Sequence, residues 1–249
     1  MFRRLLKIAG SLLLVIFIIG TLAFTYHESK DVVCRNIEID FETDELIKVD
    51  KDELIRLVKA ADSNILNKKL AQINSEAIEK AVKKHPAIFN AEVYKVMKAD
   101  SSSYKGILVV NVKHREPVVR IMSNSGSYYL DKYGKKIPIS TNYTANVLVT
   151  TGFFTDKYAT EKLLPFVLFI ENNKFWQAQI EQVHIKQNGE ILLTPLFGEH
   201  IIEFGNLDDY QKKLQKMKAF YEQILANDNW NKYKTVSLKY NNQVVAKKR

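Results

Sequence analysis

Cysteine, histidine and glycine are all scarce in this chain of 249 residues. The single cysteine, Cys34, allows no disulfide within the chain, so its domains must be held by packed cores. None of the five histidines has the spacing of a metal site, and no H-E-x-x-H or G-x-S-x-G motif occurs. The nine glycines form no phosphate-binding loop. We therefore expect no enzyme activity, no metal and no cofactor.

Charge and composition exclude two further classes of chain. Apolar residues make up 46% and aromatic residues 11%, which supports real cores and excludes a disordered stalk. The formal net charge of +9 does not indicate nucleic-acid binding, because the lysines are scattered along the chain. Attraction to anionic lipid or to cell-wall polymer is compatible with this charge. The paired lysines are Lys83–Lys84, Lys135–Lys136, Lys212–Lys213 and Lys247–Lys248.

One long apolar run stands out, from Ile8 to Tyr26. It contains 19 residues and no charge, and as a helix it would be roughly 28 Å long, close to the thickness of a bilayer core. Three basic residues precede it: Arg3, Arg4 and Lys7. Basic residues flank the cytoplasmic side of a span. We predict a cytoplasmic tail at 1–7, a transmembrane helix at 8–26 and an extracytoplasmic remainder, as in a single-pass type II membrane protein.

Two other readings of this run are possible. A cleaved signal peptide also begins basic and turns apolar, but its apolar region is shorter and ends at a small-x-small site. Ala23-Phe24-Thr25 is a poor version of that site, so the length and flanks favour a retained anchor. A lipid anchor on Cys34 is less favoured, because charged residues separate it from the run and bulky Val33 precedes it.

The segment 32–116 is predicted to form one α+β domain. Alternating apolar residues indicate strands, and helical spacing after a capping residue indicates helices. The resulting order is β-α-α-β-β, which places two helices on one face of a three-stranded sheet. The predicted elements are strand 32–41, a helix from the Asp50 cap to Ala61, helix 75–84 capped by Asn74, and strands 91–97 and 106–112.

From Pro117 to the end, residues 117–249, we predict a second domain with a mixed β-sheet and flanking helices. Asn188-Gly189, between two alternating runs, is a strong hairpin signal. Helices are predicted at 161–170 and at 207–225, the latter capped by Asn206. The final segment, 234–247, is predicted to be a hairpin about Asn241-Asn242 whose last strand is an open sheet edge.

The order of several short motifs resembles the FtsQ/DivIB family of bacterial cell-division proteins. Ser63-Asn64-Ile65-Leu66 and His85 to Val93 follow its "N-I-L … L-P-W-V-x-x-A-x-V" pattern, and Val112 to Val119 resembles its "V-x-E-R-x-P-V-A" junction. Further matches are Tyr129 to Gly134, Val147 to Gly152 and Val236 to Val245. The chain departs from the family in having His114 for a glutamate, Thr150-Thr151 in a segment without the usual prolines, and no tryptophan in the tail.

The resemblance implies a non-enzymatic scaffold of the divisome at the division septum. Its membrane-proximal POTRA domain would contact other division proteins, and its β domain would recruit FtsB-like and FtsL-like partners by strand addition. The partner-binding residues would be Leu238, Lys239, Tyr240, Asn242, Val244, Val245 and Lys247. The lysines suit an acidic partner strand, and they equally suit an edge protected against aggregation.

Two other functions are considered. A POTRA domain is also compatible with an envelope-assembly or protein-transport adaptor. A cell-wall enzyme is the second alternative, and the missing catalytic motifs argue against it.

Overall fold

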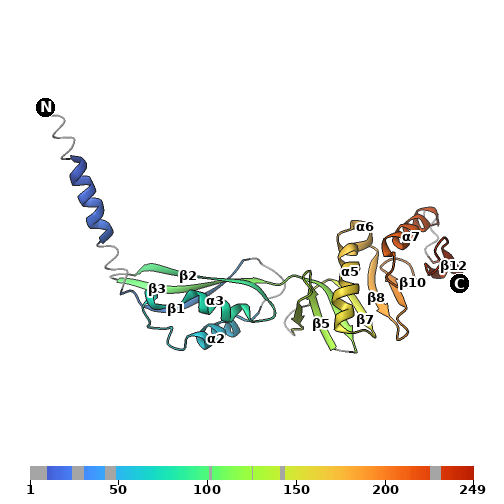
Figure 1. Cartoon of the computed structure of the whole chain (residues 1–249), viewed down its shortest axis with the longest axis horizontal. Coiled ribbons are helices and arrows are strands. Elements are labelled where there is room, and N and C mark those ends of the chain that lie inside the picture. The colour runs from blue at the N-terminus through green and yellow to red at the C-terminus, as the bar shows by residue number, and fades with distance from the viewer. Residues whose placement is uncertain are drawn as a thin grey trace. The chain divides into compact units, whose positions relative to one another are not determined.

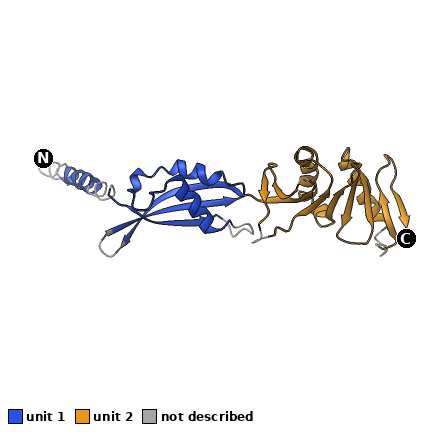
Figure 2. Ribbon diagram, turned by 90° about the horizontal axis from the view of Figure 1, so that it is seen from below, with its two compact units in different colours: residues 1–45, 49–114 blue, residues 46–48, 115–249 orange. Residues whose placement is uncertain are grey.

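The computed structural model describes residues 10–23, 31–42, 49–100, 103–124, 126–140, 144–224 and 231–249 (Figure 1). These form two compact units, the first reaching His114 and the second running from Arg115 to Arg249 (Figure 2).

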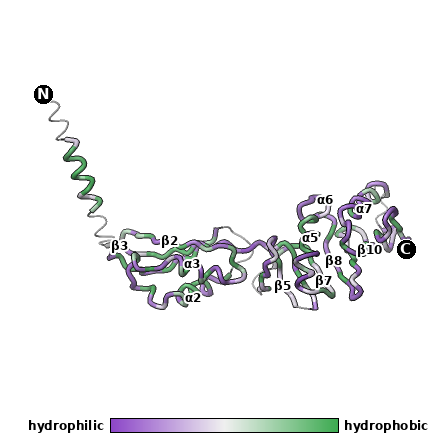
Figure 3. The backbone as a smooth tube through the Cα atoms, in the orientation of Figure 1, coloured by the Kyte–Doolittle hydropathy of each residue, from purple (hydrophilic) through white to green (hydrophobic). Residues whose placement is uncertain are grey.

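Residues 10–23 form an apolar helix, drawn green in Figure 3. Among the described helices, none has both the length and the hydropathy needed to cross a bilayer. Both ends of the predicted span, residues 8–9 and 24–26, and the predicted tail at 1–7 lie outside the described residues.

The first unit contains a three-stranded sheet with two helices on one face (Figure 2). The central strand β3 pairs in parallel with β1 and antiparallel with β2. The β-α-α-β-β order is confirmed. The elements are β1 (Cys34–Phe41), α2 (Lys51–Ala61), the short 3-10 helix η1 (Leu70–Gln72), α3 (Ser75–Lys83), β2 (Ile88–Asp100) and β3 (Ser103–His114).

The two helices begin at the residues that the sequence indicates. The Asp50 carboxylate accepts the backbone N–H of Asp52, and the Asn74 side chain accepts that of Ala77, so each side chain satisfies an N–H left unpaired at a helix start. The apolar stripes of α2 and α3 are then buried beneath the sheet. They consist of Leu54, Val58, Ile78 and Val82.

The second unit contains a nine-stranded mixed sheet in the order β12-β11-β10-β9-β8-β7-β4-β5-β6. The strands are β4 (Pro117–Ser123), β5 (Gly126–Asp131), β6 (Lys136–Pro138), β7 (Leu148–Gly152), β8 (Ile180–Ile185), β9 (Ile191–Pro195), β10 (Ile201–Gly205), β11 (Tyr233–Ser237) and β12 (Val245–Lys248). The helices are α4 (Asp156–Tyr158), the π-helical turn η2 (Ala159–Leu163), α5 (Leu164–Glu171), α6 (Lys174–Gln177) and α7 (Tyr210–Ile224). The predicted mixed sheet with flanking helices is confirmed.

Helices α5, α6 and α7 contribute large side chains to the core of this unit. Phe166 of α5 is fully buried, with its ring centroid 5.3 Å from that of Phe204 on β10. Trp176 and Met217 are buried in the same cluster. Trp176 is therefore a packing residue, whereas Trp230 lies outside the described residues.

The structure differs from the sequence prediction at two helices of this unit. The helix expected at 161–170 starts earlier, at Asp156, and passes through a π-helical turn before Pro165, whose missing N–H interrupts the regular bonding. The predicted Asn206 cap is wrong, because α7 begins at Tyr210. Asn206 instead accepts a bond from the Lys213 ammonium at 2.6 Å.

Candidate functional site: the C-terminal sheet edge

The outermost strand on one side of the large sheet is β12. It pairs antiparallel with β11, with Val236 opposite Ala246 and Ser237 opposite Val245. β11 in turn pairs in parallel with β10. Among the residues that the structure describes, no strand lies beyond β12, so one side of its backbone faces outward. The terminal hairpin is confirmed.

The direction of the β12 amides follows from one backbone bond. The N–H of Arg249 donates to the carbonyl of Lys232, on the β11 side. Successive residues of a strand direct their backbone groups to opposite sides. The N–H groups of Lys247 and Val245 therefore face β11, and those of Ala246 and Lys248 face outward. An added strand would pair with these two residues.

The connection between β11 and β12 is tied to helix α7. The ammonium of Lys216 donates to the carbonyls of Tyr240 at 2.8 Å and Asn241 at 2.9 Å. Leu238 begins the connection and is fully buried. Its N–H donates to the backbone carbonyl of Glu203 on β10 at 2.9 Å, which continues the pairing of β11 with β10 by one residue. These contacts hold the edge strand in its register.

The seven residues proposed from sequence fall into three groups. Leu238 lies in the core, and Val244 packs against it. Lys239 is bound by two carboxylates of neighbouring strands and turns, Glu190 at 2.6 Å and Glu203 at 3.9 Å. The four others are exposed: Tyr240 and Asn242 in the connection, and Val245 and Lys247 on β12.

Sequence reasoning missed the residues that fix this edge. Lys216 and Glu190 lie far along the chain from the strand that they hold, and Arg249 pairs with the carboxylate of Glu199 at 2.6 Å. No local pattern links such partners, since they meet only after the sheet has formed. Ala246 and Lys248 were also missed, and the alternation of backbone groups along the predicted strand could have identified them.

Electrostatics at the edge are dominated by basic residues with nearby acidic partners. The pKa of Glu190 falls to about 2, first because the Lys239 ammonium bonds to it and next because Lys186 does. The same contact raises the pKa of Lys239. Lys247 and Lys248 are exposed on β12 itself, so the outward strand presents positive charge.

The four described histidines make local contacts. His200 is buried against the Tyr221 hydroxyl at 2.9 Å, and burial lowers the pKa of its imidazole. His184 bonds Thr151 at 2.9 Å, and His85 accepts the N–H of Ala87. His114, at the position where the family pattern has glutamate, accepts the N–H of Val49 at 3.1 Å. Within the described ranges, no three metal-ligating side chains gather.

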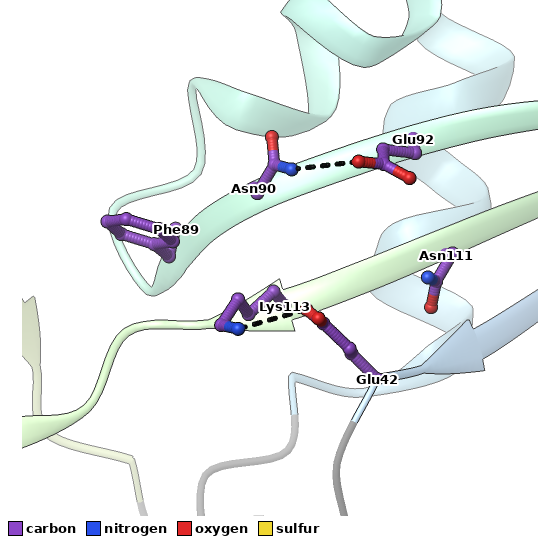
Figure 4. Close-up of a pocket in the computed structure, with 6 residues that line it drawn as sticks. All are labelled: Glu42, Phe89, Asn90, Glu92, Asn111 and Lys113. Atoms are coloured by element: carbon purple, nitrogen blue, oxygen red, sulfur yellow. Dashed lines mark hydrogen bonds and ion pairs between the residues drawn. The ribbon is translucent and has the colours of Figure 1, made fainter.

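A pocket in the first unit is lined by polar groups that pair with each other. Figure 4 shows Lys113 with Glu42, at 3.3 Å, and Asn90 with Glu92, at 3.4 Å. Phe89 and Asn111 complete the lining. The charged and amide groups of the lining are thus engaged with one another in an ion pair and a hydrogen bond.

The fold and this edge define a class: a two-unit α+β protein with a small helix-backed sheet followed by a large mixed sheet that ends in an outward strand. Residues 116–247 match the family model described as FtsQ/DivIB, C-terminal related, and residues 32–100 match a POTRA-like domain. The first match covers more than half of the chain, so the chain belongs to the FtsQ/DivIB family. A search of curated proteins returned no match.

These matches indicate a cell-division scaffold of a generally non-enzymatic type.

Proposed function

We propose that the protein is a membrane-anchored scaffold of the divisome that captures FtsB-like and FtsL-like partners by strand addition along β12. In this proposal residues 1–7 are a cytoplasmic tail, 8–26 the span, 32–116 the POTRA domain and 117–249 the partner-binding domain. The protein would stand in the inner membrane at the septum, with its bulk outside the cytoplasm. The POTRA domain would contact further division proteins.

The observation that carries the proposal is the outward side of β12. An unpaired strand edge is a template for another chain, because its N–H and C=O groups can complete a ladder. Ala246 and Lys248 supply these groups, while Val245, 43% exposed, offers an apolar side chain on the same strand. Backbone pairing would supply affinity, and contacts with Val245 would supply selectivity.

The proposal predicts that capture depends on the β12 edge. Ala246→Pro removes an outward N–H but no bond to β11, so binding of FtsB-like and FtsL-like proteins from the same cell should weaken at least tenfold. Val245→Glu should weaken it as well. Binding of the full chain can be measured by co-purification and titration, with circular dichroism to verify folding.

Met122→Glu is the matched control. Met122 is 41% exposed, nearly the same as Val245, but lies on β4 in the interior of the sheet order. It should bind like the unmodified chain. Undiminished capture by a folded Ala246→Pro variant would refute strand addition at β12. Cells depleted of the protein should grow as filaments, whereas loss of outer-membrane proteins would instead support a transport adaptor.

A further inference from the structure

His200 is a buried histidine that contacts helix α7 from the large sheet. It directly precedes β10 and is only 3% exposed. Its Nε2 atom lies 2.9 Å from the hydroxyl oxygen of Tyr221 on α7, and the two rings meet edge to face with their centroids 5.7 Å apart. A neutral imidazole suits this place, because burial penalises a charged ring and one of its nitrogens already pairs with the hydroxyl.

The charged and titratable groups around His200 do not favour a proton on its ring. Burial lowers the pKa of the imidazole, and the guanidinium of Arg249, which follows β12, lowers it further. Tyr221 keeps its proton, because burial raises the pKa of its hydroxyl. The carboxylate of the preceding residue, Glu199, pairs with Arg249. Within the described ranges, no carboxylate forms an ion pair with His200, so a proton there adds an uncompensated buried charge.

The contacts that hold the outer strand β12 pass through the neighbours of His200. Arg249 donates from Nη2 to the carbonyl of Glu199 at 3.0 Å and pairs with its carboxylate at 2.6 Å. Tyr221 lies on the same helix as Lys216, which holds the connection before β12. β12 has only four residues, and the pair of Arg249 with Glu199 is exposed, so each contact contributes little free energy. A modest opposing effect is therefore enough to release the strand.

We propose that His200 is an acid-sensitive switch whose protonation releases β12 from the sheet. The imidazolium repels the Arg249 guanidinium and gains a second N–H that requires an acceptor. The folded state favours the neutral ring, so its contribution is complete above the ordinary pKa of 6.5 and is lost as the pH falls below that value. The population with β12 released grows by up to about tenfold for each pH unit lost.

The consequence for partners rests on the proposed function. Strand addition needs an ordered edge, and a released β12 does not present one. The apparent affinity for a partner strand is reduced by the fraction of chains in which the edge is ordered. Capture should therefore weaken in acid once the released form predominates.

Hydrogen exchange of the full chain in detergent micelles tests the switch without a partner. Exchange of residues 233–249 is compared with that of β4, residues 117–123, so the dependence of the chemical exchange rate on pH cancels. Between about pH 7.5 and about pH 5, the protection of 233–249 relative to 117–123 should fall by roughly tenfold or more. His200→Gln, which keeps a polar but neutral side chain, should abolish this fall.

His184→Gln is the matched control. His184 also lies in the large sheet and bonds a hydroxyl, that of Thr151, but it is only half-buried. This variant should retain the fall in protection. A relative protection in the native chain that does not change with pH would overturn the inference and leave strand addition at β12 untouched.

A second measurement uses the native chain, in case His200→Gln does not fold. In an NMR titration, the imidazole of His200 should take up its proton over the pH range in which 233–249 loses protection. Uptake without that loss would overturn the inference. Partner capture at the two pH values then separates the proposals, because release of β12 in acid with undiminished capture supports the switch and refutes strand addition at β12.

Discussion

Gly152 is the residue at which the large sheet allows no side chain. It ends β7 with φ near +116°, and an added Cβ would lie 2.0 Å from the carbonyl oxygen of Ile185 on β8. The contact is with backbone, which cannot rotate away. In the sequence Gly152 only ends one of the family motif matches, and nothing there identifies the strand packed against it.

We expect Gly152→Ala to lower the free energy of unfolding by on the order of 3 kcal/mol, from steric overlap added to an unfavourable φ. Gly189→Ala is the comparison, because Gly189 also has positive φ but no atom near its Cβ position. Its effect should be about 1 kcal/mol. Urea denaturation measures both, and equal values would contradict the proposed overlap.

We expect the Glu190 carboxylate to make the free energy of unfolding depend on pH. Its pKa is lowered from 4.5 to about 2, mainly by the bond from Lys239, so the folded state favours the charged form. Its contribution is complete above the unfolded pKa and is lost as the pH falls from 4.5 toward 2. Denaturation midpoints of the unmodified chain and of Glu190→Gln should differ at pH 7 and converge through this window. A constant difference would contradict the assignment.

At the scale of elements, local sequence patterns predicted the turns and helix starts that depend on a few neighbouring residues. Asn188-Gly189 joins β8 and β9 as expected, and the Asn74 cap starts α3 at Ser75. The misplaced start of α7 has a local cause: the side chain of Asn206 bonds to Lys213 and Asp208, so it does not cap the helix. The parallel pairing of β10 with β11 joins strands on either side of α7, and no local pattern indicates it.

The exposed lysines of β12 should separate the two roles left open by the sequence. If they attract an acidic partner strand, Lys247→Glu with Lys248→Glu should weaken partner capture several-fold, and salt should weaken capture by the unmodified chain. If they only protect the edge, replacing them with threonine should raise self-association while capture is unchanged. Titration and analytical ultracentrifugation distinguish these outcomes.

At the scale of the whole molecule, the order of the elements could be predicted because strand and helix periodicities follow one another along the chain. The contacts that fix the candidate edge could not. Lys239 and Glu190 are 49 residues apart, and Lys216 is 24 residues from Tyr240. Side chains at such separations meet only through the sheet order, which a single sequence does not encode in any local pattern.

The two edge strands of the nine-stranded sheet differ in their capacity to pair with an added strand. The border opposite β12 is β6, only three residues long and ending at Pro138, which has no N–H to donate. A sheet that can pair with an added strand at only one of its two edges can accept a single strand. Under the proposed strand addition at β12, we therefore expect the nine-stranded sheet to accept a single incoming strand, so that one chain would hold one partner strand through this sheet.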